Sequence, residues 1–81
     1  DYYNCTLRYK PDQQCIESKS LKKYFEAFRD REITAEEMGA EMFEAFDSIM
    51  QPEAIYVRLE QARRGGIEET VEFGDISLRL D

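Results

Sequence analysis

The sequence contains no histidine. Histidine is the commonest general base and metal ligand in proteins, and it activates the nucleophile of many serine and cysteine hydrolases. Its absence excludes every catalytic pair that requires an imidazole. We therefore expect neither that hydrolase chemistry nor a bound metal ion.

Cysteine is also scarce, and long apolar runs are missing. Cys5 and Cys15 lack CxxC spacing and are too few for a disulfide framework or a zinc site, which is typical of a reducing cytoplasm. Cys5 falls within an apolar alternation, so we expect it to pack in the core. No segment approaches the roughly 20 apolar residues of a membrane helix, and no basic, apolar leader follows Asp1. These features predict a cytoplasmic protein with no membrane partner.

Basic residues are outnumbered by acidic ones. Eleven Lys and Arg against eighteen Asp and Glu give a formal net charge of −7. Such a chain repels nucleic-acid backbones, so we expect no direct nucleic-acid partner. Its 81 residues suffice for one small domain, 1–81, whose limited core makes oligomerisation an expectation.

Alternating apolar residues predict several strands. Residues 2–9 place Tyr3 and every second residue after it on one face, and residues 55–60 alternate in the same way. Gly65-Gly66 can form a tight hairpin turn into a returning strand, residues 67–73. The alternation over residues 76–80 extends that strand past a bulge or begins another.

Two segments have helical periodicity. The first helix is expected to begin near Ser18 or Ser20, with one apolar stripe formed by Leu21, Tyr24, Phe25 and Phe28. The second is expected from about Ala35 to Met50, because Thr34 and Glu37 have capping-box spacing and Pro52 prevents continuation. Its predicted buried stripe consists of Met38, Met42, Ala45, Phe46 and Ile49.

The resulting order is strand, helix, helix, strand, strand, which predicts an α+β fold. Because each strand has one apolar face, we expect an antiparallel sheet with both helices packed on one side. The chain opens directly in a strand at its first residues. We therefore expect that residues upstream of Asp1 are missing from this copy.

Two clusters carry groups that could bind phosphate. Ser18, Lys19 and Ser20 lie at the expected helix entrance, where free N–H groups and the helix dipole favour an anion. The alternative is a serine N-cap followed by a solvated lysine face. The Arg63–Gly66 segment could bring guanidinium groups and close backbone to a ligand, or it could be a plain hairpin turn. The residues alone leave both choices open.

Glu36 is a third candidate. The capping box occupies Glu37, whereas Glu36 is free to accept hydrogen bonds from the donor edge of a purine-like ring. The alternative is that both acids only stabilise the positive end of the helix dipole.

The segment Glu17–Tyr24, ESKSLKKY, resembles the signature of the NADPH-dependent 7-cyano-7-deazaguanine (preQ0) reductases of the queuosine pathway. The resemblance continues through Phe28-Arg29, Glu36, Gln51-Pro52 and Arg64–Ile67 in order, so it covers nearly the whole chain. One departure is Ala35, where the family more often has His or Tyr.

The resemblance implies the tunnelling fold, in which sheets join through their edges into homo-oligomeric barrels with active sites between subunits. It also implies that a cysteine thiolate adds to the preQ0 nitrile to give a thioimide, which NADPH reduces to the aminomethyl product, preQ1. Asp1 matches the proton-donating aspartate of the family. The nucleophilic cysteine would lie a few residues before Asp1, outside this chain.

Site residues carried over from the resemblance fall into two groups. The expected substrate contacts are Ile16, Glu17, Ser18 and Glu36. The expected NADPH contacts are Ser18, Lys19, Arg64 and Gly65, which would unite the helix entrance and the arginine turn in one dinucleotide site. Two alternatives are a related amidine-forming enzyme of archaeosine synthesis, which takes no NADPH, and a non-catalytic binding subunit of the same fold.

Overall fold

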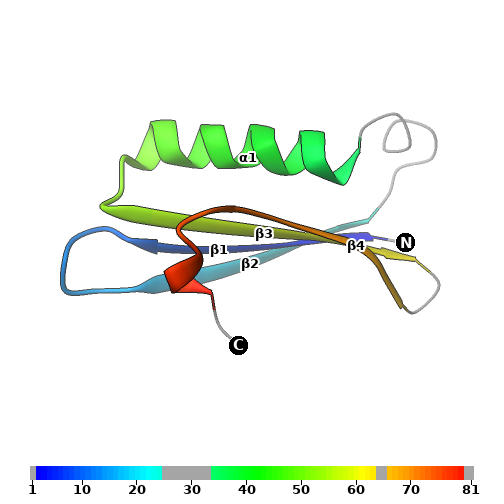
Figure 1. The fold of residues 1–81 in the computed structure, drawn as a ribbon, viewed down its shortest axis with the longest axis horizontal. Helices are drawn as coiled ribbons and strands as arrows, with labels where there is room; N and C mark the ends of the chain where they lie inside the picture. Colours follow the sequence, from blue (N-terminus) through cyan, green and yellow to red (C-terminus); the bar gives the residue numbers. More distant parts are fainter. Residues whose placement is uncertain (1, 25–33, 64–65, 80–81) are drawn as a thin grey trace.

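The computed structural model describes residues 2–24, 34–63 and 66–79. Within these ranges the chain forms a four-stranded antiparallel sheet in the order β2-β1-β3-β4, with one helix packed on it (Figure 1). This confirms the predicted α+β class and is consistent with the tunnelling fold. The elements are β1 (Tyr2–Lys10), β2 (Glu17–Tyr24), α1 (Ala35–Met50), β3 (Ala54–Arg63), β4 (Gly66–Gly74) and a 3-10 turn, η2 (Ile76–Leu78).

The central strand β1 has the alternation that the sequence predicts. Tyr3, Cys5, Leu7 and Tyr9 are buried, while the residues between them are half-buried. β1 pairs with β2 on one side and with β3 on the other, so both of its edges are hydrogen-bonded. Its register is therefore fixed by the burial of one face and by two neighbouring strands.

The first predicted helix is wrong where the structure describes it. Glu17–Tyr24 is the edge strand β2, which pairs with β1 from Tyr9↔Glu17 to Tyr2↔Tyr24. The stretch satisfies both a helical and an alternating pattern, and the hairpin with β1 supplies backbone partners that favour the strand. Phe25 and Phe28 lie outside the described residues, so one helix is seen in place of the two expected.

The second predicted helix is confirmed, with its boundaries. Thr34 is the N-cap of α1, and its Oγ1 accepts a hydrogen bond from the backbone N–H of Glu37 at 3.1 Å. At the other end Gln51 adopts a left-handed conformation, and its N–H donates to the carbonyl of Asp47 at 2.9 Å. Pro52 then follows, as a helix stop requires.

The buried stripe of α1 is rotated from the one predicted. Met38, Met42 and Phe46 pack on the core as expected. Ala45 is exposed and Ile49 is 82% exposed, and their places are taken by Phe43 and Met50. Gly39 is what allows the helix to approach β4, because a Cβ there would lie 2.6 Å from Cε2 of Phe73.

The core lies between α1 and the sheet. Tyr3, Val57 and Leu59 are among its most deeply buried side chains, and each contributes about 1.5–3 kcal/mol of hydrophobic stabilisation. α1 spans about 24 Å along the sheet, given its 16 residues. Just after its C-terminus, the N–H of Glu53 donates to the carbonyl of Lys10 at 2.8 Å. The N-terminus of α1 therefore lies at the opposite end of the sheet, where β1 begins (Figure 1).

The segment after β4 folds onto the other face of the sheet (Figure 1). Gly74 turns the chain with φ of 92°, Asp75 caps η2 by accepting from the N–H of Ser77 at 3.0 Å, and Leu78 is only 3% exposed. The guanidinium Nε of Arg8 donates to the Leu78 carbonyl. The predicted continuation of the strand through Leu78 is thus wrong, because the left-handed glycine and the Asp75 cap redirect the chain.

Candidate functional site

The candidate residues that follow the β1–β2 turn are positioned by a hairpin. Ile16, Glu17, Ser18 and Lys19 are all exposed at the start of the edge strand β2. Glu17 and Lys19 pair with Tyr9 and Leu7 and so share the face that α1 covers elsewhere, whereas Ser18 pairs with Arg8 on the opposite face. The helix entrance proposed from the sequence, with its dipole, does not exist here.

Tyr9 is the partner of Glu17. The Tyr9 hydroxyl donates a hydrogen bond to Oε2 of Glu17 at 3.2 Å, and Tyr9 itself is only 8% exposed. Burial, the nearby Glu17 charge and this hydrogen bond together raise the pKa of the Tyr9 phenol. The sequence did not predict this contact, because a helix was expected to begin near Ser18 or Ser20. A hairpin around Pro11-Asp12 would have placed Tyr9 opposite Glu17.

Glu36 lies at the other end of the domain, together with the last residue of β3 and the first residue of β4. Glu36 is exposed in the first turn of α1, beside the end of the sheet where β1 begins. Arg64 and Gly65 lie outside the described residues, but their neighbours Arg63 and Gly66 pair directly at this same end. Asp1 also lies outside the described residues.

The separation between the two groups can be read from the strand register. Lys19 is opposite Leu7, which in turn is opposite Val57, and Arg63 is six residues farther along β3. At about 3.3 Å per residue, Lys19 and Arg63 therefore lie about 20 Å apart along the strands. Within one chain the structure brings Glu17, Ser18 and Lys19 together, and in the part of the chain that it describes it does not bring them to Glu36, Arg63 or Gly66.

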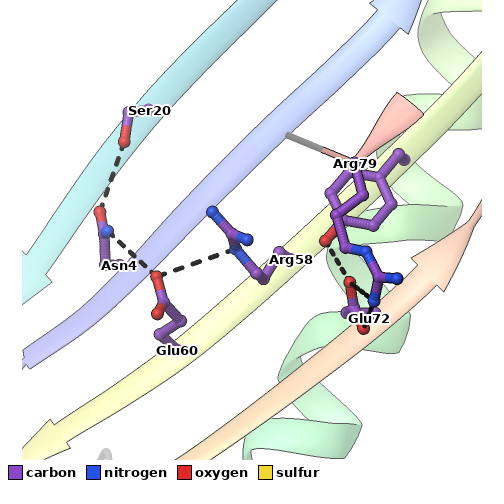
Figure 2. Close-up of polar contacts among 7 residues, drawn as sticks. Asn4, Ser20, Arg58, Glu60, Glu72 and Arg79 are labelled. Carbon is purple, nitrogen blue, oxygen red and sulfur yellow. Dashed lines mark hydrogen bonds and ion pairs between the residues drawn. The ribbon is translucent and has the colours of Figure 1, made fainter. Parts of the chain in front are cut away.

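The face opposite α1 carries a row of polar contacts, shown in Figure 2. Ser20 Oγ donates to Oδ1 of Asn4 at 3.4 Å, and the Asn4 amide donates to Oε1 of Glu60 at 3.5 Å. Nε of Arg58 lies 3.9 Å from the same Glu60 oxygen. These contacts run across β2, β1 and β3, so they hold the edge strand to the centre of the sheet.

A second polar cluster on this face ties β4 to the C-terminal segment. Glu72 accepts a hydrogen bond from the Tyr56 hydroxyl at 2.5 Å and pairs with Nη1 of Arg79 at 3.1 Å (Figure 2). The hydrogen bond from Tyr56, followed by the charge of Arg79, lowers the pKa of the Glu72 carboxyl. Burial and the Glu72 contact raise the pKa of Tyr56 to about 12. At neutral pH the pair is therefore a phenol donating to a carboxylate.

Cys5 is a core residue, as expected. Its thiol is buried beside a small apolar cavity of about 50 Å³ that Leu21 and Met42 also line. Burial raises the pKa of the Cys5 thiol to about 11, so it is protonated at neutral pH and unsuited to nucleophilic attack. Cys15 is exposed. In the described ranges no three His, Cys, Asp or Glu side chains gather in a way that could hold a metal ion, and no helix could span a membrane.

The fold defines an α+β protein in which a helix covers one face of an antiparallel sheet and the segment Glu17–Tyr24 forms an edge strand. A sequence profile of the family described as QueF-like protein matches residues 1–78. The chain therefore belongs to the QueF-like protein family.

Curated relatives support this assignment. A protein of Pelodictyon phaeoclathratiforme named NADPH-dependent 7-cyano-7-deazaguanine reductase is 42% identical over 71 residues, which cover 88% of this chain and 61% of the relative. Proteins of the same name from Chlorobium chlorochromatii and Chlorobaculum tepidum are each 41% identical over the same shares. The chain thus spans 61% of the length of these relatives. No solved structure matches it.

Proposed function

We propose that the protein containing this chain reduces the nitrile of preQ0 to the aminomethyl group of preQ1 with NADPH, in queuosine synthesis. The observation that carries the proposal is the 42% identity to a protein named for this reaction, across 88% of the chain. The signature segment that prompted the resemblance is exposed along the edge strand β2, so its polar groups are accessible to ligands.

The reaction consumes two NADPH and two protons for each nitrile and yields one primary amine and two NADP⁺. We infer that it begins when a cysteine thiolate, supplied from outside the 81 residues, adds to the nitrile carbon to give a thioimide. NADPH supplies the hydrides when bound. In this proposal Asp1 donates a proton to the nitrogen, and the thiol is released before the second reduction. The buried thiol of Cys5 supports assigning the nucleophile to another residue.

The substrate contacts are proposed to come from both ends of the domain. Glu36 anchors the amino and ring N–H edge of the deazaguanine, since a carboxylate can accept two such hydrogen bonds. Ile16, Glu17 and Ser18 contact the base from the start of β2. Because Glu17 and Glu36 lie at opposite ends of one chain, a single site requires two copies, which supports an active site between subunits.

The exposed groups near the start of β2 fit an anionic cofactor. Lys19 presents an ammonium group to solvent and Ser18 presents a hydroxyl, both suited to phosphate. They point to opposite faces of β2, so a dinucleotide touching both lies along the free edge of this strand. We propose that Ser18 and Lys19 of one copy and Arg64 and Gly65 of another hold NADPH.

Charge supports assembly through the sheet edges into a homo-oligomer. β2 carries Lys19 and Lys22, whereas the other edge strand, β4, carries Glu68, Glu69 and Glu72. β2 and β4 run in opposite directions, so β2 of one copy can add antiparallel to β4 of the next with α1 on the same side. Copies joined in this way keep their corresponding ends aligned, so the proposed site joins Glu17 of one copy to Glu36 of a copy that packs against it end to end. The free Cys5 and Cys15 support a cytoplasmic location.

The proposal is tested by giving preQ0 and NADPH to the full gene product and measuring NADPH absorbance and the product mass. Oxidation of two NADPH per preQ0 with formation of preQ1 is expected. An amidine formed from ammonia without NADPH would indicate the archaeosine-type reaction. Tight preQ0 binding with no product would indicate a binding subunit.

A further inference from the structure

The only buried side chain that the structure places on a proposed substrate residue, among those it describes, is Tyr9. We propose that Tyr9 is a positioning residue, whose hydroxyl holds the Glu17 carboxylate in the orientation that accepts the second ring N–H of the deazaguanine, on its five-membered ring, which Glu36 does not contact. This inference rests on the proposed function, because it assigns a role to a contact of that site.

Tyr9 is rigidly placed, whereas Glu17 is not. Tyr9 sits in the central strand β1, paired on both sides with Glu17 and Ile55, and its ring belongs to the hydrophobic core. Glu17 is exposed at the first position of an edge strand, where its side chain can adopt several rotamers. The 3.2 Å hydrogen bond from the Tyr9 hydroxyl therefore restricts the exposed Glu17 carboxylate to a position fixed by the core.

The geometry of the contact leaves the carboxylate competent to bind. The Tyr9 hydroxyl occupies Oε2, so Oε1 retains its lone pairs for a donor from the ligand. Fixing the carboxylate before binding removes part of the ordering cost that an unrestrained glutamate would bear in the complex.

The test is Tyr9→Phe in the full gene product, with dissociation constants for preQ0 and for NADPH measured by calorimetry. The ring stays in the core and only the hydroxyl is lost. We expect preQ0 binding to weaken about fivefold to tenfold and NADPH binding to change less than twofold, as for loss of one hydrogen bond of ordinary net strength. The matched control is Tyr56→Phe, which removes the other buried phenol that donates to a glutamate, Glu72, on the opposite face. It should leave preQ0 affinity unchanged.

A double-mutant cycle separates positioning from general loss of structure. In a Glu17→Gln background, Tyr9→Phe should have less than a twofold effect on preQ0 affinity, because the carboxylate that it orients is gone. An unchanged preQ0 affinity in Tyr9→Phe, or an equal loss with and without Glu17, would overturn the inference while the wild type still binds preQ0. A wild type that does not bind preQ0 would overturn the proposed function and this inference together.

Discussion

Glu17 and Glu36 lie at opposite ends of the domain. Glu17 begins β2 beside the buried phenol of Tyr9, and Glu36 lies in the first turn of α1 where β1 begins. Both are exposed. Since both are proposed to contact one small base, each copy of the chain would contribute half of two different sites.

Glu36→Gln should weaken preQ0 binding by about 1–3 kcal/mol, because a charged acceptor is replaced opposite the donors of the base. Calorimetric titration of the full gene product measures this. Glu37→Gln is the matched control, since it removes the same charge from the same helical turn. Equal losses in the two variants would mean that only helix electrostatics are involved, and would remove Glu36 from the site.

Lys19→Ala should weaken NADPH binding about tenfold and preQ0 binding less than twofold, because an exposed ammonium contributes mainly to phosphate recognition. Lys22→Ala is the control on the same strand, where the ammonium lies 4.5 Å from the centre of the Tyr2 ring. The NADPH effect should shrink as salt is added, owing to screening. If Lys19→Ala lowers the affinity for both ligands equally, its assignment to the cofactor is wrong.

Much of the sheet could be predicted from sequence because β1 and β3 each bury one face, and burial imposes a period of two. The strand β2 could not be predicted, because residues on both of its faces are exposed, among them Ser18, Lys19 and Leu21. No burial pattern therefore distinguishes this segment from a helix. Edge strands of this kind are specified by their neighbour, here the hairpin with β1.

The candidate site was predictable in its parts and not in its arrangement. Glu17, Ser18 and Lys19 are adjacent in sequence, so they lie close together whatever fold the chain adopts. Their separation from Glu36 depends on the direction in which α1 crosses the sheet, which no local pattern encodes. The Tyr9 contact likewise depends on a pairing register.

Gly74→Ala should destabilise the domain by about 2–4 kcal/mol. Gly74 has φ of 92°, and a Cβ there would collide with the backbone carbonyl of Ile55. Gly66→Ala is the control, because the nearest atom to its Cβ is 4.0 Å away. Urea unfolding of both variants measures the difference. Comparable midpoints for the two alanine variants would contradict the turn geometry described for β4 and η2.

Glu72→Gln should reduce the acid sensitivity of folding. The pKa of Glu72 is lowered in the folded state, chiefly by the Tyr56 hydrogen bond and also by Arg79. Its stabilising contribution is therefore present above the unfolded pKa, of about 4.3, and is lost as pH falls through the folded pKa. Unfolding curves for wild type and variant, measured at neutral pH and at successively lower pH, should converge as pH falls through the folded pKa of Glu72. Glu44→Gln, on the exposed side of α1, is the control for net charge. If its stability changed with pH in the same way as that of Glu72→Gln, the contacts of Glu72 with Tyr56 and Arg79 would not be the cause.

Complementation between two inactive variants tests the shared site most directly. Glu17→Gln and Glu36→Gln full-length proteins should each lose preQ0 reduction. When they are coexpressed in equal amounts, about one quarter of the shared sites should combine an intact Glu17 of one copy with an intact Glu36 of another, by random assembly. The account predicts that preQ0-dependent NADPH oxidation returns to about a quarter of the wild-type rate. A mixture no more active than either variant alone would contradict it, because one chain would then supply both carboxylates.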